Sequence, residues 1–576
     1  MKFQLYIILF LLLGTALHAQ TPDQFFKASG TPANPKVDVS WNRYNTAEGL
    51  AEIAKKIAAA YPELAKLSSI GKSYQGRDLW CLTITDFNSG DPDRKPGFYI
   101  DGNIHSNEIQ GAEIAMYTAW YLTESFDENA FIKDLLTKRI FYIVPTINPD
   151  ARNDYMQGAN TAHSPRSGMI PIDDDRDGEY DEDGYEDLNG DGHVSQMRRK
   201  NPYGRWIDDP RNPGRMIRAE NDERGTYENL GYEGIDNDGD GQVNEDRVGG
   251  YYDPNRNWGW NWQPEYIQSG SHQYPFSIPE DRAVADFIMA HPNIAGAQSY
   301  HNSGGMILRG PGSEEDERVY SRGDIQVYDA IGNLGEKIIP GYRYLVIYKD
   351  LYSTYGGEIE WFHGGRGIFS FTNELYTSYL MYNKTETDAQ DRVDFSKRLL
   401  FEDDVIAWEP YDHPVFGPIE IGGTKKNSGR ADPGFLLETD AHRNMAFTLY
   451  HAAQMPDLVI EEIEEKDLGG GYLQVTAVVG NLAIIPTHSD HDIKNKITRP
   501  DFIKLEGAPV VSGLRVLDRL MNRTEEQESN PAQISVPNIS GMDAVTVRWI
   551  VKARPGADYT ITVDSMKGGV VSRSKE

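Results

Sequence analysis

Short apolar segments alternate with amphipathic segments along most of this chain, and this alternation constrains its fold more than any other sequence feature. The segments with the length and character of buried strands are residues 79–85, 97–101, 140–146 and 295–300. The segments with helical periodicity are residues 47–61, 107–125 and 278–289. Strands that alternate with helices predict an α/β domain over residues 20–455, with a mixed, mostly parallel central sheet flanked by helices.

The pattern changes after Pro456. Apolar and polar residues then alternate with period two, and turn residues separate the alternating segments. The apolar positions are Leu473, Val475, Ala477 and Val479, then Val545, Val547, Trp549 and Val551. A strand with one buried face has this period, so residues 456–576 are predicted to form a small, separate β-sandwich.

The N-terminus has the features of a secretory signal. Lys2 supplies a positive charge, residues 6–13 are an apolar run, and small residues end at Ala19. The alternative is a short membrane anchor, but the apolar run is shorter than the ~20 residues that a spanning helix needs. Residues 1–19 are therefore predicted to be a signal peptide. The mature chain is expected in the periplasm or outside the cell, with no membrane attachment after cleavage.

Charge and cysteine content exclude several classes of protein. The chain has 57 Lys+Arg and 88 Asp+Glu, a formal net charge of −31. Such an acidic chain is a poor partner for nucleic acid or for an anionic membrane surface. The single cysteine, Cys81, excludes an intrachain disulfide and a cysteine-based zinc site. Any metal must therefore be held by His, Asp, Glu or backbone oxygens.

Polar residues that suit a metal site stand at the ends of three predicted strands. His105 and Glu108 follow the strand at 97–101, His301 ends the strand at 295–300, and Glu374 ends a further apolar segment. In an open α/β sheet, ligands collect at the carboxyl ends of the strands. Two His and one Glu make an open zinc site, and another carboxylate can accept a proton from water. The alternatives are a surface helix start for the His-x-x-Glu pair and a structural core histidine for His301.

These residues resemble those of zinc metallocarboxypeptidases of the carboxypeptidase A/T type, and the resemblance runs from about Tyr44 to Met455. It implies one catalytic zinc held by His105, Glu108 and His301, with Glu374 as the general base. The resemblance also implies that Asn255 and Arg256 bind the terminal carboxylate of the substrate, and that Asp253 orients the first ligand histidine. It implies that Tyr352 covers the bound substrate and that Ile359 contacts its side chain. Arg199, which matches the family pattern better than its neighbour Arg198, is implied to polarise the scissile carbonyl.

Departures from the family pattern bear on specificity. Asn107 stands where the family often has Arg, which affects binding beyond the first subsites. An apolar Ile359 favours an apolar or aromatic C-terminal residue in the substrate. Its neighbours Glu358 and Glu360 would favour a basic residue if the local structure were shifted. The sequence leaves open the residue preference, the natural substrate and the oligomeric state.

An acidic insertion at about residues 165–250 interrupts the α/β pattern. Three stretches follow the start of a calcium loop, in which oxygens at positions 1, 3 and 5 surround the ion and Gly at 6 makes the turn. Their oxygen-bearing residues are Asp173, Asp175 and Asp177; Asp187, Asn189 and Asp191; and Asp236, Asp238 and Asp240. None has Glu at position 12, so Glu245 or Asp246 is expected to complete the shell. Two or more structural calcium ions are expected, and they would hold Arg199 and Arg256 in place; the alternative is a solvated acidic loop.

The predicted function is that of an exported zinc carboxypeptidase acting on the C-termini of peptides or proteins. A second hypothesis is a zinc amidase or peptidase on cell-wall stem peptides, which also carry a free carboxylate. A third, of another class, is a calcium-dependent binding protein on an inactive peptidase scaffold. The four intact residues of the expected zinc site speak against it. The β-sandwich shows no chemistry of its own, and its role stays open.

Overall fold

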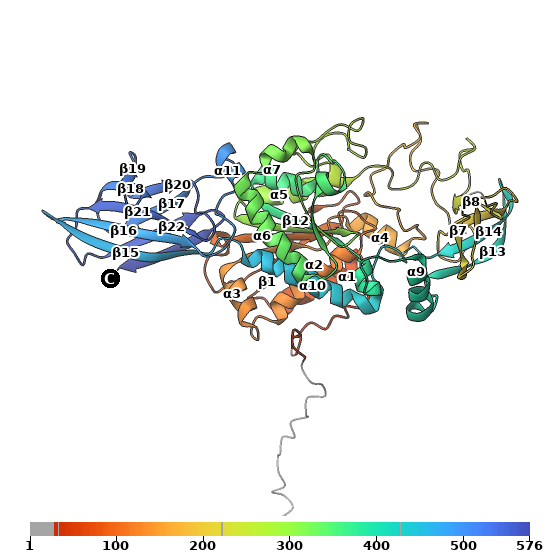
Figure 1. Ribbon diagram of the computed structural model, residues 1–576, viewed down its shortest axis with the longest axis horizontal. Coiled ribbons are helices and arrows are strands. Elements are labelled where there is room, and N and C mark those ends of the chain that lie inside the picture. The colour runs from red at the N-terminus through yellow and green to blue at the C-terminus, as the bar shows by residue number, and fades with distance from the viewer. Residues whose placement is uncertain (1–27, 33, 221–222, 427, 576) are drawn as a thin grey trace, which may run out of the picture.

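An eight-stranded mixed sheet forms the centre of the computed structural model, which describes residues 28–32, 34–220, 223–426 and 428–575 (Figure 1). In spatial order its strands are β1 (Ala65–Lys72), β2 (Asp78–Ile84), β4 (Ile140–Val144), β3 (Gly97–Gly102), β9 (Ile294–Asn302), β12 (Phe369–Leu375), β10 (Met306–Arg309) and β11 (Arg343–Val346). The four central strands from β4 to β12 are all parallel to one another. This confirms the predicted α/β fold; the predicted signal peptide lies outside the described residues.

Helices cover both faces of this sheet. One face carries α1 (Ala47–Ala60), α2 (Gln110–Glu124), α3 (Ala130–Lys138), α6 (Arg322–Ile338) and α10 (Gly434–Ala453), and the other carries α5 (Pro279–Ala290) and α7 (Glu358–Arg366). Strand β3 shows why both faces are covered. Phe98 and Ile100 lie in the core below the first group of helices, whereas Tyr99 lies in the core below the second. Successive side chains of a strand point to opposite faces, so a strand that is apolar throughout must be buried on both.

A separate antiparallel sheet, which the sequence did not predict, lies at one end of the molecule (Figure 1). In spatial order its strands are β13 (Val405–His413), β14 (Gly417–Thr424), β5 (Gln196–Lys200), β8 (Tyr227–Tyr232), β6 (Trp206–Asp209) and β7 (Asn212–Arg218). Residues 405–424, which lie within the predicted α/β domain over residues 20–455, supply two of these strands, β13 and β14. The strands from the insertion are short and mostly polar, so they lack the apolar runs or regular alternation that would predict them.

The C-terminal region folds into two antiparallel sheets at the opposite end of the molecule (Figure 1). One contains β15 (Leu458–Gly469), β16 (Tyr472–Asn481), β21 (Asp543–Val551), β18 (Val510–Asp518) and β19 (Arg523–Glu526). The other contains β20 (Gln533–Val536), β17 (Asp501–Glu506), β22 (Tyr559–Ser565) and β23 (Gly569–Lys575). Alternate residues such as Val475, Val547 and Trp549 fill the core between the sheets. The residues that alternate with period two thus place their apolar side chains in a single layer between the two sheets.

Four further α-helices are short. They are α4 (Pro149–Gln157), α8 (Ser378–Tyr382), α9 (Ala389–Phe395) and α11 (Asp490–Asn495). In the part of the chain that the structure describes, every helix is too short or too polar to cross a bilayer.

Candidate active site

The three predicted metal ligands lie together at the carboxyl ends of two neighbouring parallel strands. His105 and Glu108 follow β3, and His301 lies near the end of β9. The Nδ1 atoms of the two histidines are 3.1 Å apart. Glu108 Oε2 lies 3.0 Å from His301 Nδ1 and 3.2 Å from His105 Nδ1. All three side chains are at most 3% exposed, so the three donor atoms converge on one buried point.

An asparagine shapes the loop that carries two of these ligands. Asn103 has a left-handed backbone (φ 60°), which Asn tolerates better than most residues. Its side-chain amide donates to the carbonyls of His105 and Ser106, at 2.8 and 3.1 Å. Its Oδ1 accepts from Thr146 Oγ1 at 3.1 Å and from Arg152 Nη1 at 3.0 Å. The loop is therefore held in place by side-chain hydrogen bonds where regular structure ends.

This donor set fits zinc. Two imidazole nitrogens and one carboxylate oxygen are the usual protein ligands of an open zinc site. His105 Nε2 lies 2.8 Å from Asp253 Oδ1, and this contact turns Nδ1 toward the other two donors. Burial alone would raise the pKa of Asp253, but the charges of His105, Arg256 and Arg166 hold that pKa well below its usual range. Asp253 is therefore a carboxylate, as a partner of a ligating histidine should be.

Glu374 lies beside the metal ligands. It is in register with His301 across the parallel pair of β12 and β9, so the two side chains leave the sheet at neighbouring points. Burial, and then the charge of Glu108, raise the pKa of Glu374 to about 7, although His301, Arg166 and Arg430 act in the opposite direction. A carboxyl group with such a pKa is suited to accept and return a proton near neutral pH.

A cleft of about 420 Å³ opens over these residues, and the four predicted substrate-binding residues line it, namely Asn255, Arg256, Tyr352 and Ile359. Asn255 is held from both sides: its N–H donates to Asp253 Oδ1, and the N–H of Glu358 donates to its Oδ1, each at 2.8 Å. Tyr352 is 60% exposed and stands at the mouth of the cleft. All four residues therefore lie in one cleft with the candidate metal ligands.

The structure corrects the expected place of Arg199. That residue lies on β5 in the separate sheet, where its Nη2 donates to Glu228 Oε2 at 2.9 Å. Two other arginines line the cleft instead. Arg166 Nη1 and Arg430 Nη2 donate to Glu108 Oε1 at 2.8 and 2.9 Å. Neither has a sequence signal of its own, because Arg166 lies at the stem of the insertion and Arg430 is 322 residues from Glu108.

The acidic loops are only partly brought together. Carboxylates of the first loop (residues 173–178) approach those of the third (residues 236–241). Among the described residues, Asp187 and Asp191 of the second loop join no such group. The carboxylate of Asp187 instead accepts from the N–H groups of Gly190, Asp191 and Gly192, at 2.8 to 3.1 Å. Asn189 accepts from the N–H of Asp191 at 3.0 Å.

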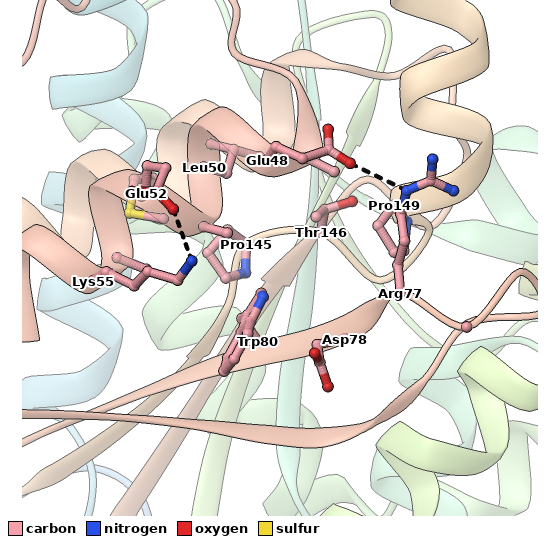
Figure 2. Close-up of a pocket in the computed structure, with 15 residues that line it drawn as sticks. Glu48, Leu50, Glu52, Lys55, Arg77, Asp78, Trp80, Pro145, Thr146 and Pro149 are labelled. Carbon is pink, nitrogen blue, oxygen red and sulfur yellow. Dashed lines mark hydrogen bonds and ion pairs between the residues drawn. The ribbon is translucent and has the colours of Figure 1, made fainter.

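A second pocket, of about 280 Å³, lies between α1 and β2 (Figure 2). Glu48 points to Arg77, with Oε1 3.2 Å from Nε, and Glu52 points to Lys55, with Oε1 2.7 Å from Nζ (Figure 2). Its charged side chains thus pair largely with one another. Trp80 supplies an apolar wall. The arrangement lacks the converging donors of the cleft, so the chemistry is assigned to the cleft.

Two histidines and a glutamate thus converge at the carboxyl ends of parallel strands, beside a second, partly buried glutamate, and this arrangement is typical of metal-dependent hydrolases. The sequence model described as zinc carboxypeptidase matches residues 50–177 and 182–390, together more than half of the chain. The chain belongs to the zinc carboxypeptidase family. Residues 457–576 match a second model, described as a domain of unknown function.

Individual relatives match over shorter stretches. A zinc carboxypeptidase of Saccharothrix mutabilis subsp. capreolus is 35% identical over 107 residues, which are 19% of this chain and 24% of the relative. An inactive metallocarboxypeptidase, ECM14, of Ajellomyces capsulatus is 30% identical over 125 residues, 22% of this chain and 21% of the relative. The chain thus spans less than a quarter of either relative's length in these matches. The structure of carboxypeptidase A from Helicoverpa armigera aligns with a TM-score of 0.42 at 18% identity, covering 74% of this chain and 77% of that one.

Proposed function

We propose that this protein is an exported zinc metallocarboxypeptidase that removes residues from the C-termini of peptides or proteins. The observation that carries the proposal is the convergence of His105, Glu108, His301 and Glu374 in one cleft with Arg256. Family membership alone leaves activity open, because one relative is an inactive metallocarboxypeptidase. A protein without activity would not need to keep both the ligand set and a general base.

Zinc, when bound by His105, Glu108 and His301, supplies Lewis-acid activation of water and of the scissile carbonyl. The remaining steps belong to side chains of the cleft. Glu374 accepts the proton of the attacking water and returns it to the leaving amine. Arg166 and Arg430 donate hydrogen bonds to the oxygen that becomes negative as the carbonyl is attacked.

Recognition of a free C-terminus is assigned to Arg256 and Asn255. A guanidinium binds a carboxylate through two parallel hydrogen bonds, so Arg256 binds a terminal carboxylate more tightly than an internal peptide group. Tyr352, exposed at the mouth, is placed to close over the bound residue. Asp253, which contacts both His105 and Asn255, ties the metal site to the carboxylate site.

Calcium and export are also parts of this proposal. The three acidic loops, with the residues predicted above, are proposed to bind two or more structural calcium ions. Residues 1–19, which lie outside the described residues, are proposed to direct export to the periplasm or beyond. Stem peptides of the cell wall end in a free carboxylate as well, so they remain a second substrate class.

The test is zinc analysis of the purified protein, followed by incubation with a peptide library and measurement of the released amino acids. We expect about one zinc per chain and stepwise release from free C-termini. Peptides with an amidated C-terminus should resist, because Arg256 then lacks its anionic partner. The variant Glu374→Gln should keep zinc and lose activity by about 10²–10⁴-fold. Absence of zinc together with absence of release would contradict the proposal, and including stem peptides separates the two substrate classes.

A further inference from the structure

We propose that the first and third acidic loops share one cluster of calcium ions, the cation cluster, instead of binding ions separately. We further infer that this cluster holds together two chain segments that position Arg166 and Asp253 at the zinc site. The second inference rests on the proposed zinc site, whereas the first does not.

Carboxylates of the first and third loops lie close to one another and to nearby acidic residues. Four groups of acidic residues have ligand atoms within 4.8 Å of one another: Asp173, Asp175 and Asp246; Asp175, Asp177, Glu182 and Asp238; Asp183, Asp236 and Asp238; and Asp238, Asp240 and Glu245. Asp238 belongs to three groups and Asp175 to two. Sharing of this kind places several cation positions side by side, which independent loops would not do.

Asp246 gives evidence for a ligand that is separate from the clustering of acids. It is 0% exposed, and neither of its oxygens has a hydrogen-bond partner among the described residues. One of its oxygens points at Asp173 and Asp175. The side-chain oxygens of Glu182 and Glu245 are likewise buried without partners. A buried carboxylate is stable only when a charge of opposite sign or a hydrogen-bond donor lies next to it. None of these three residues belongs to the Asp-x-Asp-x-Asp-Gly pattern, so they are evidence independent of it.

Calcium is the cation that this chemistry fits. It takes six to eight oxygen ligands, carboxylates above all, in flexible geometry. Asp246 lies close to the carboxylates of Asp173 and Asp175, and like charges at such short range repel one another when no cation lies between them. A bound Ca²⁺ would remove this repulsion.

The two ends of the insertion run from the cation cluster to the zinc site. Arg166 lies seven residues before Asp173, and Asp253 lies seven residues after Asp246. Hydrogen bonds join the two segments between these points. The Ser167 hydroxyl donates to the carbonyls of Gly250 (2.8 Å) and Tyr252, the Ile170 N–H donates to the Tyr252 hydroxyl (3.1 Å), and the Asp174 carboxylate accepts from the Tyr251 N–H (2.9 Å).

The far ends of these segments meet at the zinc site. Arg166 Nη2 lies 3.4 Å from Asp253 Oδ2, and Asp253 in turn contacts His105 Nε2. Without cations, repulsion in the cluster would separate the two segments and move Asp253 away from His105. Loss of such a partner typically weakens metal binding by 10–100-fold. Calcium is therefore expected to raise the affinity of this protein for zinc.

The first experiment measures calcium binding to the full chain by calorimetry. Ca²⁺ is first removed with a selective chelator, the chelator is removed by dialysis, and zinc is then added back. We expect two or more Ca²⁺ per chain, a rise in Tm, and at least tenfold weaker binding in Asp246→Asn. The matched control is Glu233→Gln, a buried acid of the same insertion whose oxygens accept from Ser195 and Leu188. It should bind Ca²⁺ as the wild type does.

Equal Ca²⁺ affinity in wild type and Asp246→Asn, or no binding by the wild type, would overturn the cluster. If Asp246→Asn fails to fold, Glu182→Gln tests the same claim. The second experiment measures zinc affinity by competition with a chromophoric chelator, with and without Ca²⁺. A 10–100-fold gain with Ca²⁺ supports the coupling, and equal affinity overturns it. Neither readout needs peptide hydrolysis, so failure of the carboxypeptidase proposal would be seen separately, as absent release by the zinc-loaded wild type.

Discussion

Glu108 serves two groups of partners at once. Its Oε2 faces the two histidines and accepts from the Asn302 N–H, and its Oε1 accepts from Arg166 and Arg430. One buried carboxylate thus sets the position of the metal donors and of both arginines. Arginines beside a metal ligand are well placed to stabilise the negative oxygen that peptide hydrolysis creates.

The placement of the arginines leads to a direct comparison. Arg166→Met should lower kcat by about 10²–10³-fold, because one donor to the oxyanion is lost. Arg199→Met should leave kcat and KM within about twofold, since that side chain pairs with Glu228 outside the cleft. Steady-state kinetics on a peptide with a free C-terminus, with zinc content checked for both variants, measures the difference. The reverse ranking would restore Arg199 as the catalytic arginine.

Glu360 supplies the cleft with a carboxyl group beside Ile359, the residue predicted to recognise the substrate side chain. It lines the cleft next to Ile359, is 7% exposed, and its Oε1 has no hydrogen-bond partner among the described residues. A lysine at the substrate's C-terminus could lay its aliphatic chain on the apolar wall and reach this carboxylate. Glu360→Gln should therefore reduce kcat/KM about tenfold or more for peptides ending in Lys and leave those ending in Leu nearly unchanged. An equal loss for both would assign Glu360 a structural role.

At the scale of elements, helix periodicity predicted α5 but not the environment of its first turn. Acidic residues suit a helix N-terminus, and Glu280 occupies that position. Yet Glu280 is only 4% exposed, and its Oε1 accepts from the Tyr74 N–H at 2.7 Å. Burial raises its pKa from 4.5 to about 7. This burial depends on the turn between β1 and β2, which no local pattern in α5 reports.

The consequence is a stability that depends on pH. In the folded chain Glu280 stays protonated up to about pH 7, whereas in the unfolded chain it loses its proton near pH 4.5. Between these two pH values the unfolded state is favoured by ionisation of Glu280, so the stability of the fold decreases as the pH rises. Glu280→Gln keeps an acceptor and removes the charge. Its stability relative to wild type should be unchanged at pH 4 and should increase by about 3 kcal/mol by pH 8, as measured by urea unfolding. The exposed Glu265→Gln serves as control, and a gain that does not vary with pH would refute the argument.

At the scale of the whole molecule, one lysine links the C-terminal sheets to the α/β domain. Lys567, in the turn before β23, is 3% exposed. Its Nζ donates to the carbonyls of Arg366 and Gly367 at 2.8 and 2.9 Å, and to Asp492 Oδ2 at 3.1 Å. Those carbonyls end α7, the helix that begins beside the cleft and carries Ile359. The sandwich therefore supports a helix of the candidate active site.

Replacing this lysine should destabilise the whole protein. Lys567→Met leaves the buried Asp492 without this cation and two carbonyls without their donor, and we expect a loss of about 3–5 kcal/mol. The measurement is denaturant unfolding of the full chain, with the exposed Lys552→Met as the matched control. Equal unfolding midpoints for the two variants would show that the contact between the domains contributes little.

Local patterns in the sequence were enough to predict the α/β class, the β-sandwich and the residues His105, Glu108, His301 and Glu374. Strand and helix periods extend over neighbouring residues, and parallel strands bring their carboxyl ends together wherever they pair. The place of Arg166 and Arg430, the sheet that removes Arg199 from the cleft, and the sharing of carboxylates between distant loops required the folded chain. These features depend on contacts between segments that are far apart in sequence, such as the 322 residues between Glu108 and Arg430. No period or spacing within one segment records such contacts.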